Sequence, residues 1–423
     1  MSIEERFKGL QWVPGELTPD PVWTIKPDLE SIRQTVAEYQ KSHKISVSEI
    51  HRGISQIYEV RVDNQVLVMR VYLPLDPENK TLSEVATVNW TRRHTSLPVP
   101  NIIAYQASRE NAIKFEWTLV EKIQGKSLKD SWRTMQYSVK EQLVQQIAAY
   151  FSSSYKHRLL GIGNIYPGGS ELSQHRVERI VSMPFFWANH ILQDVPRGPF
   201  RTTKDWFSAW LLIHKNDCNS ILAKPENGYD DEKCVKDAKG VLRVVERLES
   251  HLSEFFPDDC ADPETTMLIN DDLSKCNMLV DENGILTGVL DWQCVTALPL
   301  WKTCYYPSFI EGPPRDEKPD PNEYSHSDDE NSESLYWQHL REYEHTKLRQ
   351  YFLDEMRRLE PDWVEIFDSS AVKRDFHFAV ECSNIGFLAD PINEWLDDVD
   401  RNEGTVRSLT NIMEKYCAPR CCE

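Results

Sequence analysis

The chain has 423 residues, of which 40% are hydrophobic and 10% aromatic, so it is long and apolar enough to bury more than one hydrophobic core. Its 67 acidic residues exceed its 48 Lys and Arg residues, and the resulting net charge of −19 argues against nucleic acid or an anionic membrane as partner. The sequence has neither the apolar stretch of a signal peptide nor a run long enough to span a bilayer. Its ten cysteines include no CxxC pair. We therefore expect a cytoplasmic protein with free thiols.

The first part of the chain has the pattern of a leader followed by strands. Residues 1–44 hold several Trp and Pro residues and a predicted helix over 29–39, and nothing in them indicates a function. From 45 to 123, apolar and polar residues alternate as in half-buried strands, most clearly over 66–72 and 113–120. We expect these strands to form one antiparallel unit with the helix packed outside it.

Helical periodicity dominates residues 124–423. Ser138 and Glu141 form a predicted capping box at the start of one helix. The stripes of apolar residues that follow at helical spacing predict a helical core rather than a cofactor site. Residues 311–333 are dense in Pro, Asp, Glu and Ser, which predicts a solvated acidic loop.

The most informative stretch is residues 268–292, where a predicted hairpin carries polar side chains at its open end. The Asn-Gly pair in its turn, residues 282–284, tolerates the positive φ that tight turns need. Whether that loop counts two residues or three, Asn277 comes to lie beside Asp291, with Asp272 just upstream. Such carboxylate and amide oxygens suit Mg²⁺, and Asp272 would be left to face a hydroxyl group. For either Asp272 or Asn277 taken alone, an ordinary turn residue is the alternative interpretation.

These residues resemble a known family. Asp272, Asn277 and Asp291 match the catalytic Asp, the metal-binding Asn and the metal-binding Asp of the aminoglycoside phosphotransferase and choline kinase group. Residues 291–301 are most similar to its fungal branch, and the resemblance extends over about residues 45–310. It implies a two-lobed, protein-kinase-like α+β fold: an N-lobe with an antiparallel sheet and a helix, and a larger, mainly helical C-lobe. It also implies ATP and Mg²⁺ as cofactors and a small-molecule hydroxyl acceptor.

The resemblance assigns further side chains to the nucleotide phosphates. Gly53 and Ser55 lie in a turn that would cover them, although a single glycine also fits a plain hairpin. Arg70 would clamp phosphate oxygens bidentately, and Glu84, on a helix that Ser83 is predicted to cap, would hold Arg70 in place. Taken alone, Arg70 could equally be an exposed arginine on a strand. Taken alone, Glu84 could be a favourable carboxylate in the first turn of a helix.

Residues 121–125 break the strand pattern where the resemblance places the hinge between the lobes. Backbone groups around Glu121 and Ile123 would bind the adenine ring there. Side-chain identity carries little information about such contacts, so these two residues are site predictions that rest on the resemblance.

Three features depart from the family pattern and leave two functions open. Asn270 stands where the family usually has histidine, Gln293 replaces a frequent acidic residue, and the glycine loop has only Gly53. The first function is an ATP-dependent small-molecule kinase in which Asp272 orients and deprotonates the acceptor hydroxyl. The second is a pseudokinase-like module that holds a nucleotide or metabolite without turnover. The acidic surface would either attract a cationic acceptor or only keep the protein soluble. The sequence does not specify which small molecule is the acceptor.

Overall fold

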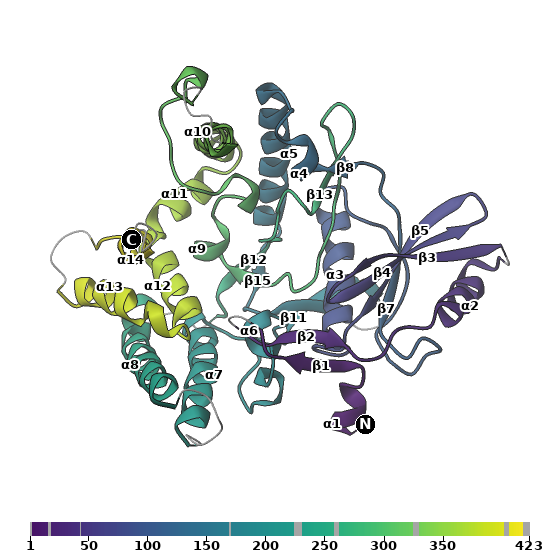
Figure 1. Ribbon diagram of the computed structural model, residues 1–423, viewed down its shortest axis with the longest axis horizontal. Helices are drawn as coiled ribbons and strands as arrows, with labels where there is room; N and C mark the ends of the chain where they lie inside the picture. Colours follow the sequence, from purple (N-terminus) through teal and green to yellow (C-terminus); the bar gives the residue numbers. More distant parts are fainter. Residues whose placement is uncertain are drawn as a thin grey trace.

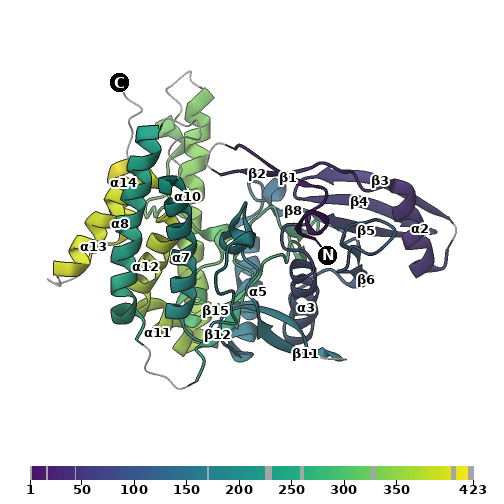
Figure 2. The ribbon, with the colours of Figure 1, turned by 90° about the horizontal axis from the view of Figure 1, so that it is seen from below.

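The computed structural model describes residues 2–417, with gaps at 16–17, 43, 169–170, 224–230, 258–261, 325–329 and 402–405. Its elements divide into two lobes (Figures 1 and 2). A strand-rich N-lobe lies at one end of the molecule, and a larger helical C-lobe occupies the other. The two-lobed α+β fold expected from the sequence is confirmed.

Five antiparallel strands form the N-lobe sheet in the order β3-β4-β5-β7-β6. Their bounds are β3 Ile45–Arg52, β4 Ser55–Val62, β5 Gln65–Tyr72, β6 Ile102–Gln106 and β7 Trp117–Glu121. Alternate residues of β4 and β5, such as Tyr58, Val60 and Leu67, are at most 1% exposed and pack with Ile32 of helix α2 (Leu29–Gln40). The alternation of apolar residues therefore marked the strands correctly, and the predicted helix over 29–39 is confirmed.

One predicted strand is shorter than expected. The pattern predicted a strand over 113–120, but β7 begins only at Trp117. The side-chain oxygen of Asn111 accepts hydrogen bonds from the backbone N–H groups of Ile113 (2.8 Å) and Lys114 (3.1 Å), and Lys114 has φ of +67°. A turn therefore occupies the first half of the predicted strand, and its buried apolar residues produced the misleading alternation.

Helix α3 spans Asn79–His94 and begins earlier than predicted, because a distant segment caps its N-terminus. The buried carboxylate of Glu116 accepts hydrogen bonds from the backbone N–H of Glu78 (2.6 Å) and the hydroxyl of Thr81 (2.5 Å). Burial raises the pKa of Glu116 to about 7, although these hydrogen bonds oppose the rise. Ser83, the predicted cap, is buried inside the helix. A cap that comes from another part of the chain has no signature in the local sequence.

The remaining elements surround the central hairpin and build the C-lobe. They are β8 Lys126–Ser127, α4 Leu128–Ser131, α5 Tyr137–Lys156, β9 Leu159–Leu160, β10 Asn164–Gly168, β11 Glu171–Glu178, α6 Met183–Phe186, η1 His190–Leu192, α7 Thr203–Ala223, α8 Asp231–Phe255, β12 Thr265–Leu268, β13 Met278–Val280, β14 Leu286–Val289, β15 Ala297–Pro299, α9 Leu300–Thr303, η2 Ser308–Ile310, η3 Pro321–Tyr324, α10 Glu330–Leu359, α11 Pro361–Ser369, α12 Ala371–Cys382, η4 Gly386–Leu388, α13 Ala389–Arg401 and α14 Leu409–Cys417. Helix α5 has Gln136 as its N-cap and no side-chain cap, so the predicted capping box of Ser138 and Glu141 does not form.

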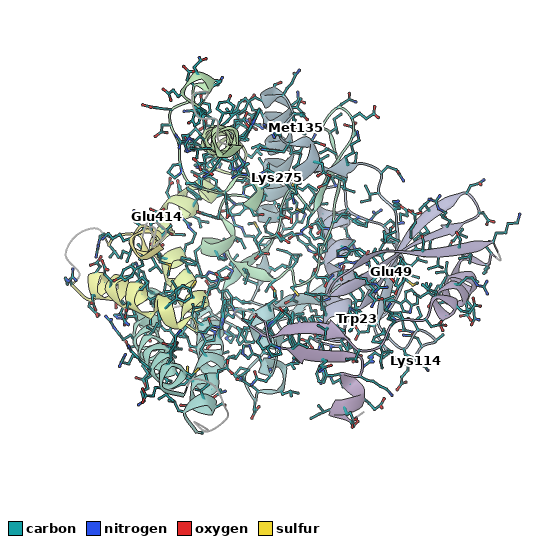
Figure 3. The ribbon with its side chains drawn as sticks, in the orientation of Figure 1. Trp23, Glu49, Lys114, Met135, Lys275 and Glu414 are labelled. Atoms are coloured by element: carbon teal, nitrogen blue, oxygen red, sulfur yellow. The ribbon has the colours of Figure 1, made fainter. Side chains whose placement is uncertain are left out.

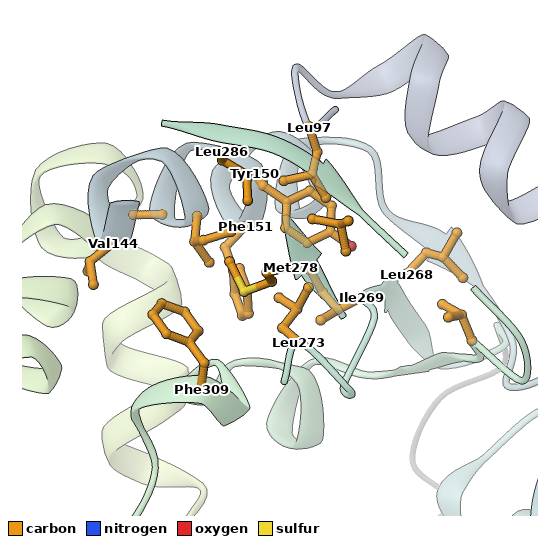
Figure 4. Close-up of a cluster of buried hydrophobic side chains, with 14 of the residues drawn as sticks. Leu97, Val144, Tyr150, Phe151, Leu268, Ile269, Leu273, Met278, Leu286 and Phe309 are labelled. Carbon is orange, nitrogen blue, oxygen red and sulfur yellow. The ribbon is translucent and has the colours of Figure 1, made fainter. Parts of the chain in front are cut away.

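A hydrophobic core lies directly beneath the polar residues of the hairpin (Figure 4). Leu273 and Met278 are fully buried and cluster with Phe151 of α5 and with Phe309. Burial of one such side chain contributes roughly 1.5–3 kcal/mol to stability. Leu273 directly follows Asp272, and Met278 directly follows Asn277. The burial of these two apolar side chains therefore fixes the backbone on which Asp272 and Asn277 lie.

Residues 311–333, predicted as one acidic loop, form a loop only in part. A short helix, η3, occupies 321–324, and α10 begins at residue 330, so the loop prediction is wrong for 330–333. Glutamate is a good helix former, and a run of acidic residues is therefore compatible with a helix start. The centre of the predicted loop, 325–329, lies outside the described residues.

Within the described part of the chain, we find no helix with the length and apolar character of a membrane span.

An N-terminal hairpin joins the two lobes. It consists of β1 (Leu10–Val13) and β2 (Asp20–Trp23). The indole N–H of Trp23 donates to the backbone carbonyl of Gly53 in the N-lobe (2.9 Å). From the C-lobe, the indole N–H of Trp187 donates to the carbonyl of Pro19 (2.9 Å). The N-terminal hairpin therefore connects the N-lobe to the C-lobe, and helix α2 covers the N-lobe sheet.

Candidate active site

The central hairpin has the predicted geometry. Strands β13 and β14 pair antiparallel with Met278 opposite Val289, and the glycine of the Asn-Gly turn has φ of +81°. The backbone N–H of Leu290 donates to the carbonyl of Asn277 (2.7 Å). Asn277 therefore lies opposite residue 290, and Asp291 follows at the open end of the ribbon.

Asn270 braces the loop at the position where the family usually has histidine. Its side-chain amide donates to the backbone carbonyl of Asp291 (2.9 Å) and accepts from the backbone N–H of Asp272 (3.0 Å). Its own backbone N–H donates to the Tyr150 hydroxyl (3.2 Å), and Asn270 is 2% exposed. Asn270 thus connects the segment that carries Asp272 to the segment that carries Asp291. An asparagine in place of the usual histidine therefore still holds the loop in position.

Asp272 is exposed to solvent as a residue, and the hairpin holds its carboxylate in place. The Asn277 amide N–H donates to a carboxylate oxygen of Asp272 (2.8 Å). Burial raises the pKa of Asp272, while hydrogen bonds from Ser274 and Asn277 oppose that rise. The Asn277 amide oxygen takes no part in this contact and remains an oxygen donor for a cation.

Arg70 extends from β5 and pairs with both Glu84 and Asp291. One guanidinium nitrogen lies 2.8 Å from a Glu84 carboxylate oxygen and another lies 3.2 Å from Asp291. The side chains of Arg70 and Glu84 are only 17% and 6% exposed, so water screens their interaction poorly. Burial works against the charge on Arg70, but Glu84, Tyr72 and Asp291 outweigh it and raise its pKa. A permanent cation therefore lies at the open end of the hairpin.

Three buried polar atoms around this pair lack a hydrogen-bond partner in the described part of the chain: Arg70 Nε, Glu84 Oε2 and Lys80 Nζ. Lys80 is 4% exposed, and its ammonium lies 4.7 Å from the ring centroid of Tyr72. An unpaired buried ammonium is costly, and two orphaned donors favour an anionic group such as phosphate here. We did not predict Lys80 from the sequence, since one lysine near a helix start carries no local signal.

Of the two residues predicted to cover the phosphates, Ser55 contacts the loop that carries Asp291, whereas Gly53 contacts Trp23, Ser55 and His51. Gly53 lies in the tight connection between β3 and β4, and Ser55 begins β4. The Gln293 amide N–H donates to the Ser55 hydroxyl (3.3 Å). Gln293 therefore links the start of β4 to the loop that carries Asp291.

Glu121 and Ile123 lie where the hinge was predicted. Glu121 ends β7, and its backbone N–H donates to the Asn101 carbonyl (3.1 Å). Ile123 packs on Gly288 of β14, where a Cβ would come within 2.7 Å of its side chain. The hinge thus rests on the back of the central hairpin, and adenine binding by its backbone stays a prediction.

A cavity of about 410 Å³ opens beside these groups. Asp272, Asp291 and Lys80 line it directly. Arg70 and Asn277 stand behind its wall and hold the two carboxylates. The structure therefore brings Asp272, Asn277, Asp291, Arg70, Glu84 and Ser55 together, as predicted, and adds Lys80.

We expect the Arg70–Glu84 pair to act as one unit toward an anion. Arg70→Ala should weaken ATP binding by about tenfold or more, because a hydrogen bond to a charged group contributes roughly 1.5–3 kcal/mol. Glu84→Ala should weaken binding less once Arg70 is gone. Calorimetric titration of a double-mutant cycle measures the coupling, with Glu30→Ala on exposed α2 as control. Strict additivity of the two effects would contradict this prediction.

A sheet lobe and a helical lobe that meet at an ordered set of Asp, Asn and Asp residues define a protein-kinase-like phosphotransferase architecture. Residues 46–301, more than half of the chain, match the Phosphotransferase enzyme family. The chain belongs to this family, which confirms the resemblance.

Individual relatives are distant. A subtelomeric hrmA-associated cluster protein of Aspergillus fumigatus is 23% identical over 301 residues, which cover 61% of this chain and 58% of the relative. An altered inheritance of mitochondria protein 9 of Meyerozyma guilliermondii is 28% identical over 142 residues, or 31% of this chain and 23% of the relative. This chain thus spans less than two thirds of the length of either relative. A solved structure of a thermostable aminoglycoside phosphotransferase APH(4)-Ia with ADP and hygromycin B is 16% identical and has a TM-score of 0.42, covering 89% of this chain and 100% of that one.

Proposed function

We propose that the protein transfers the γ-phosphoryl group of ATP to a hydroxyl group of a small molecule. The observation that carries this proposal is the convergence of Asp272 and Asp291 on one cavity, with Asn277 and Arg70 bonded to these carboxylates from behind. Phosphoryl transfer requires mainly positioning and charge neutralisation from the protein. A carboxylate that accepts a proton, a cation site and a fixed guanidinium supply these needs.

The nucleotide phosphates fit the cationic side of the cavity. Arg70 and Lys80 present buried donors without partners among the described residues. The Asn277 amide oxygen and the Asp291 carboxylate would hold Mg²⁺, which takes one or two protein carboxylates and completes its shell with water and phosphate. The described residues contain no group of three or more His, Cys, Asp or Glu side chains that could hold a metal by themselves, so phosphate oxygens and water would supply the other ligands. The bound ion would neutralise charge on the phosphates.

Asp272 serves the acceptor in this proposal. Its carboxylate takes the proton of the acceptor hydroxyl as the oxygen attacks the γ-phosphorus and the bond to the ADP oxygen breaks. The hydrogen bond from Asn277 holds the carboxylate in one orientation. Such general-base assistance contributes roughly 10² to 10⁴ in rate.

The far wall of the cavity suits a cationic acceptor. Trp187, Trp206 and Trp210 line it together with the carboxylates of Asp271 and Glu381, which outnumber the ammonium group of Lys302 among them. A cation gains from both the ring faces and the negative charges. The net charge of −19 acts in the same direction at longer range.

A binding module without turnover is the alternative function. Gln293 favours it, because it contributes no negative charge next to Asp291 and its amide is engaged with Ser55. The same geometry would then hold a nucleotide without assisting transfer.

We expect Mg²⁺ and ATP together to stabilise the fold far more than ATP alone. The reason is that Asn277 and Asp291 supply too few ligands for Mg²⁺ without phosphate oxygens. A ligand at 100 times its dissociation constant adds about 2.7 kcal/mol to the free energy of unfolding. Calorimetric melting with ATP, Mg²⁺ or both measures this. Unchanged midpoints in all three conditions would contradict nucleotide binding.

A further inference from the structure

A second cavity, of about 630 Å³, lies beside helix α10, and none of its lining residues lines the candidate active site. The start of α5, helix α4, α10 and Lys275 of the hairpin loop enclose it. Figure 3 shows Lys275 and Met135, two of its lining residues, near each other beside α10. Its volume falls in the range of small-molecule sites, roughly 300–1,000 Å³.

The lining of this cavity is cationic in an otherwise acidic chain. Among the described residues, its lining contains Lys129, Arg133, Lys140, Lys275 and Arg341 but one carboxylate, Glu344. The Lys140 ammonium lies 2.6 Å from a Glu344 oxygen, so that pair is internally balanced. Lys129 and Arg341 are exposed and form no ion pair with any residue that the structure describes. Lys129 and Arg341 therefore place positive charge at the rim that no described carboxylate pairs with.

The floor of the cavity is a tryptophan whose ring lies close to two ammonium groups. Lys275 Nζ lies 4.6 Å and Lys140 Nζ 4.9 Å from the ring centroid of Trp132. Trp132 is 6% exposed, and its indole N–H has no hydrogen-bond partner within the described residues. A buried donor without an acceptor costs free energy, and an anion in the cavity could supply an acceptor.

Lys275 adds a buried positive charge to this floor. It donates to the Phe309 carbonyl (2.6 Å) and contacts His345 Nε2 at 3.2 Å. His345 is neutral, because burial and then Lys275 lower its pKa to about 3. The ammonium groups of Lys275 and Lys140 lie 4.6 Å and 4.9 Å from the ring centroid of Trp132, so their charges repel each other, and a bound anion would relieve that repulsion.

We propose that this cavity is a binding site for a small organic anion that carries phosphate or carboxylate groups. Lys129 and Arg341 bind its charged oxygens at the rim, and Trp132 lies at the floor close to Lys140 and Lys275. The net charge of −19 disfavours nucleic acid here, and the volume of the cavity is in the range of small-molecule sites. This site stands independently of the proposed kinase activity, since it uses no residue of the candidate active site.

Isothermal titration of the full-length protein with inorganic pyrophosphate and with citrate, without Mg²⁺, tests the proposal. Lys129→Gln/Arg341→Gln should weaken binding of both probes by roughly tenfold or more, because each charge-assisted contact is worth about one decade. The matched control, Lys126→Gln/Lys347→Gln, removes two exposed charges from neighbouring positions that do not line the cavity and should bind as the parent does. Both pairs lie at the surface, so folding should be unaffected.

Arg70→Ala separates the two anion sites. Pyrophosphate and citrate should still bind in the second cavity of Arg70→Ala, because Arg70 does not line it. They should bind there even if the parent protein does not bind Mg²⁺–ATP, so the proposed function and the second site can fail separately. Equal loss of probe binding in the control pair, loss in Arg70→Ala alone, or no saturable binding by the parent would each overturn the proposal. Binding of poly-glutamate without binding of either small probe would also overturn it, in favour of an acidic polypeptide.

Discussion

Asp272→Asn should lower phosphate transfer by roughly 10²-fold or more while Mg²⁺–ATP binding survives. The substitution keeps the shape of the side chain and removes the proton acceptor. The side-chain oxygen of the new asparagine can still accept the hydrogen bond that Asn277 donates to Asp272 over 2.8 Å. Turnover against a panel of hydroxylated cations, beside calorimetric titration with Mg²⁺–ATP, separates the two effects.

The pH profile supplies a second readout of the same residue. Burial raises the pKa of Asp272, and a general base is active only when deprotonated. The acid limb of kcat/KM should therefore lie above the ordinary aspartate pKa of about 3.9 and should vanish in Asp272→Asn. Equal turnover in this variant and the parent would exclude Asp272 as the base. Intact nucleotide binding without turnover in the parent, across the whole panel, would favour the binding module.

The central hairpin was predictable because local rules determine it. An Asn-Gly turn between two apolar strands sets the register, and the register places Asn277 beside Asp291. The same applies to the N-lobe strands, whose alternation follows from one buried face. The Arg70–Glu84 pair came from the family resemblance instead, since fourteen residues separate its partners and no local pattern connects them.

The features that escaped prediction depend on contacts between distant segments. Glu116 caps α3 from outside the helix, so Ser83 was the wrong start. Lys80 is unremarkable in the sequence, and only the fold buries its ammonium beside the cavity. The basic cavity likewise combines α4, the hairpin loop and α10, which lie far apart along the chain. Local pattern carries no information about such convergence.

Asp291→Asn should fail in the opposite way from Asp272→Asn, through loss of metal-dependent nucleotide binding. Asp291 has φ of +54°, a left-handed conformation that Asn adopts readily, so the backbone should be preserved. The change removes a carboxylate from the cation site, and Gln293 supplies no replacement charge. The affinity for ATP in the presence of Mg²⁺ should fall by roughly tenfold or more, since a contact to a charged group contributes about 1.5–3 kcal/mol.

Titration with ATP in the presence and absence of Mg²⁺ isolates the metal-dependent part of this loss. Asp291 also lies 3.2 Å from Arg70, but Arg70 keeps Glu84 as a partner at 2.8 Å, so metal-free ATP binding should change little. Glu282→Gln, an exposed carboxylate on the turn of the same hairpin, controls for net charge and should behave as the parent does. If Asp291→Asn bound Mg²⁺–ATP as tightly as the parent, Asp291 would not be the metal ligand, and its contact with Arg70 would be its main role.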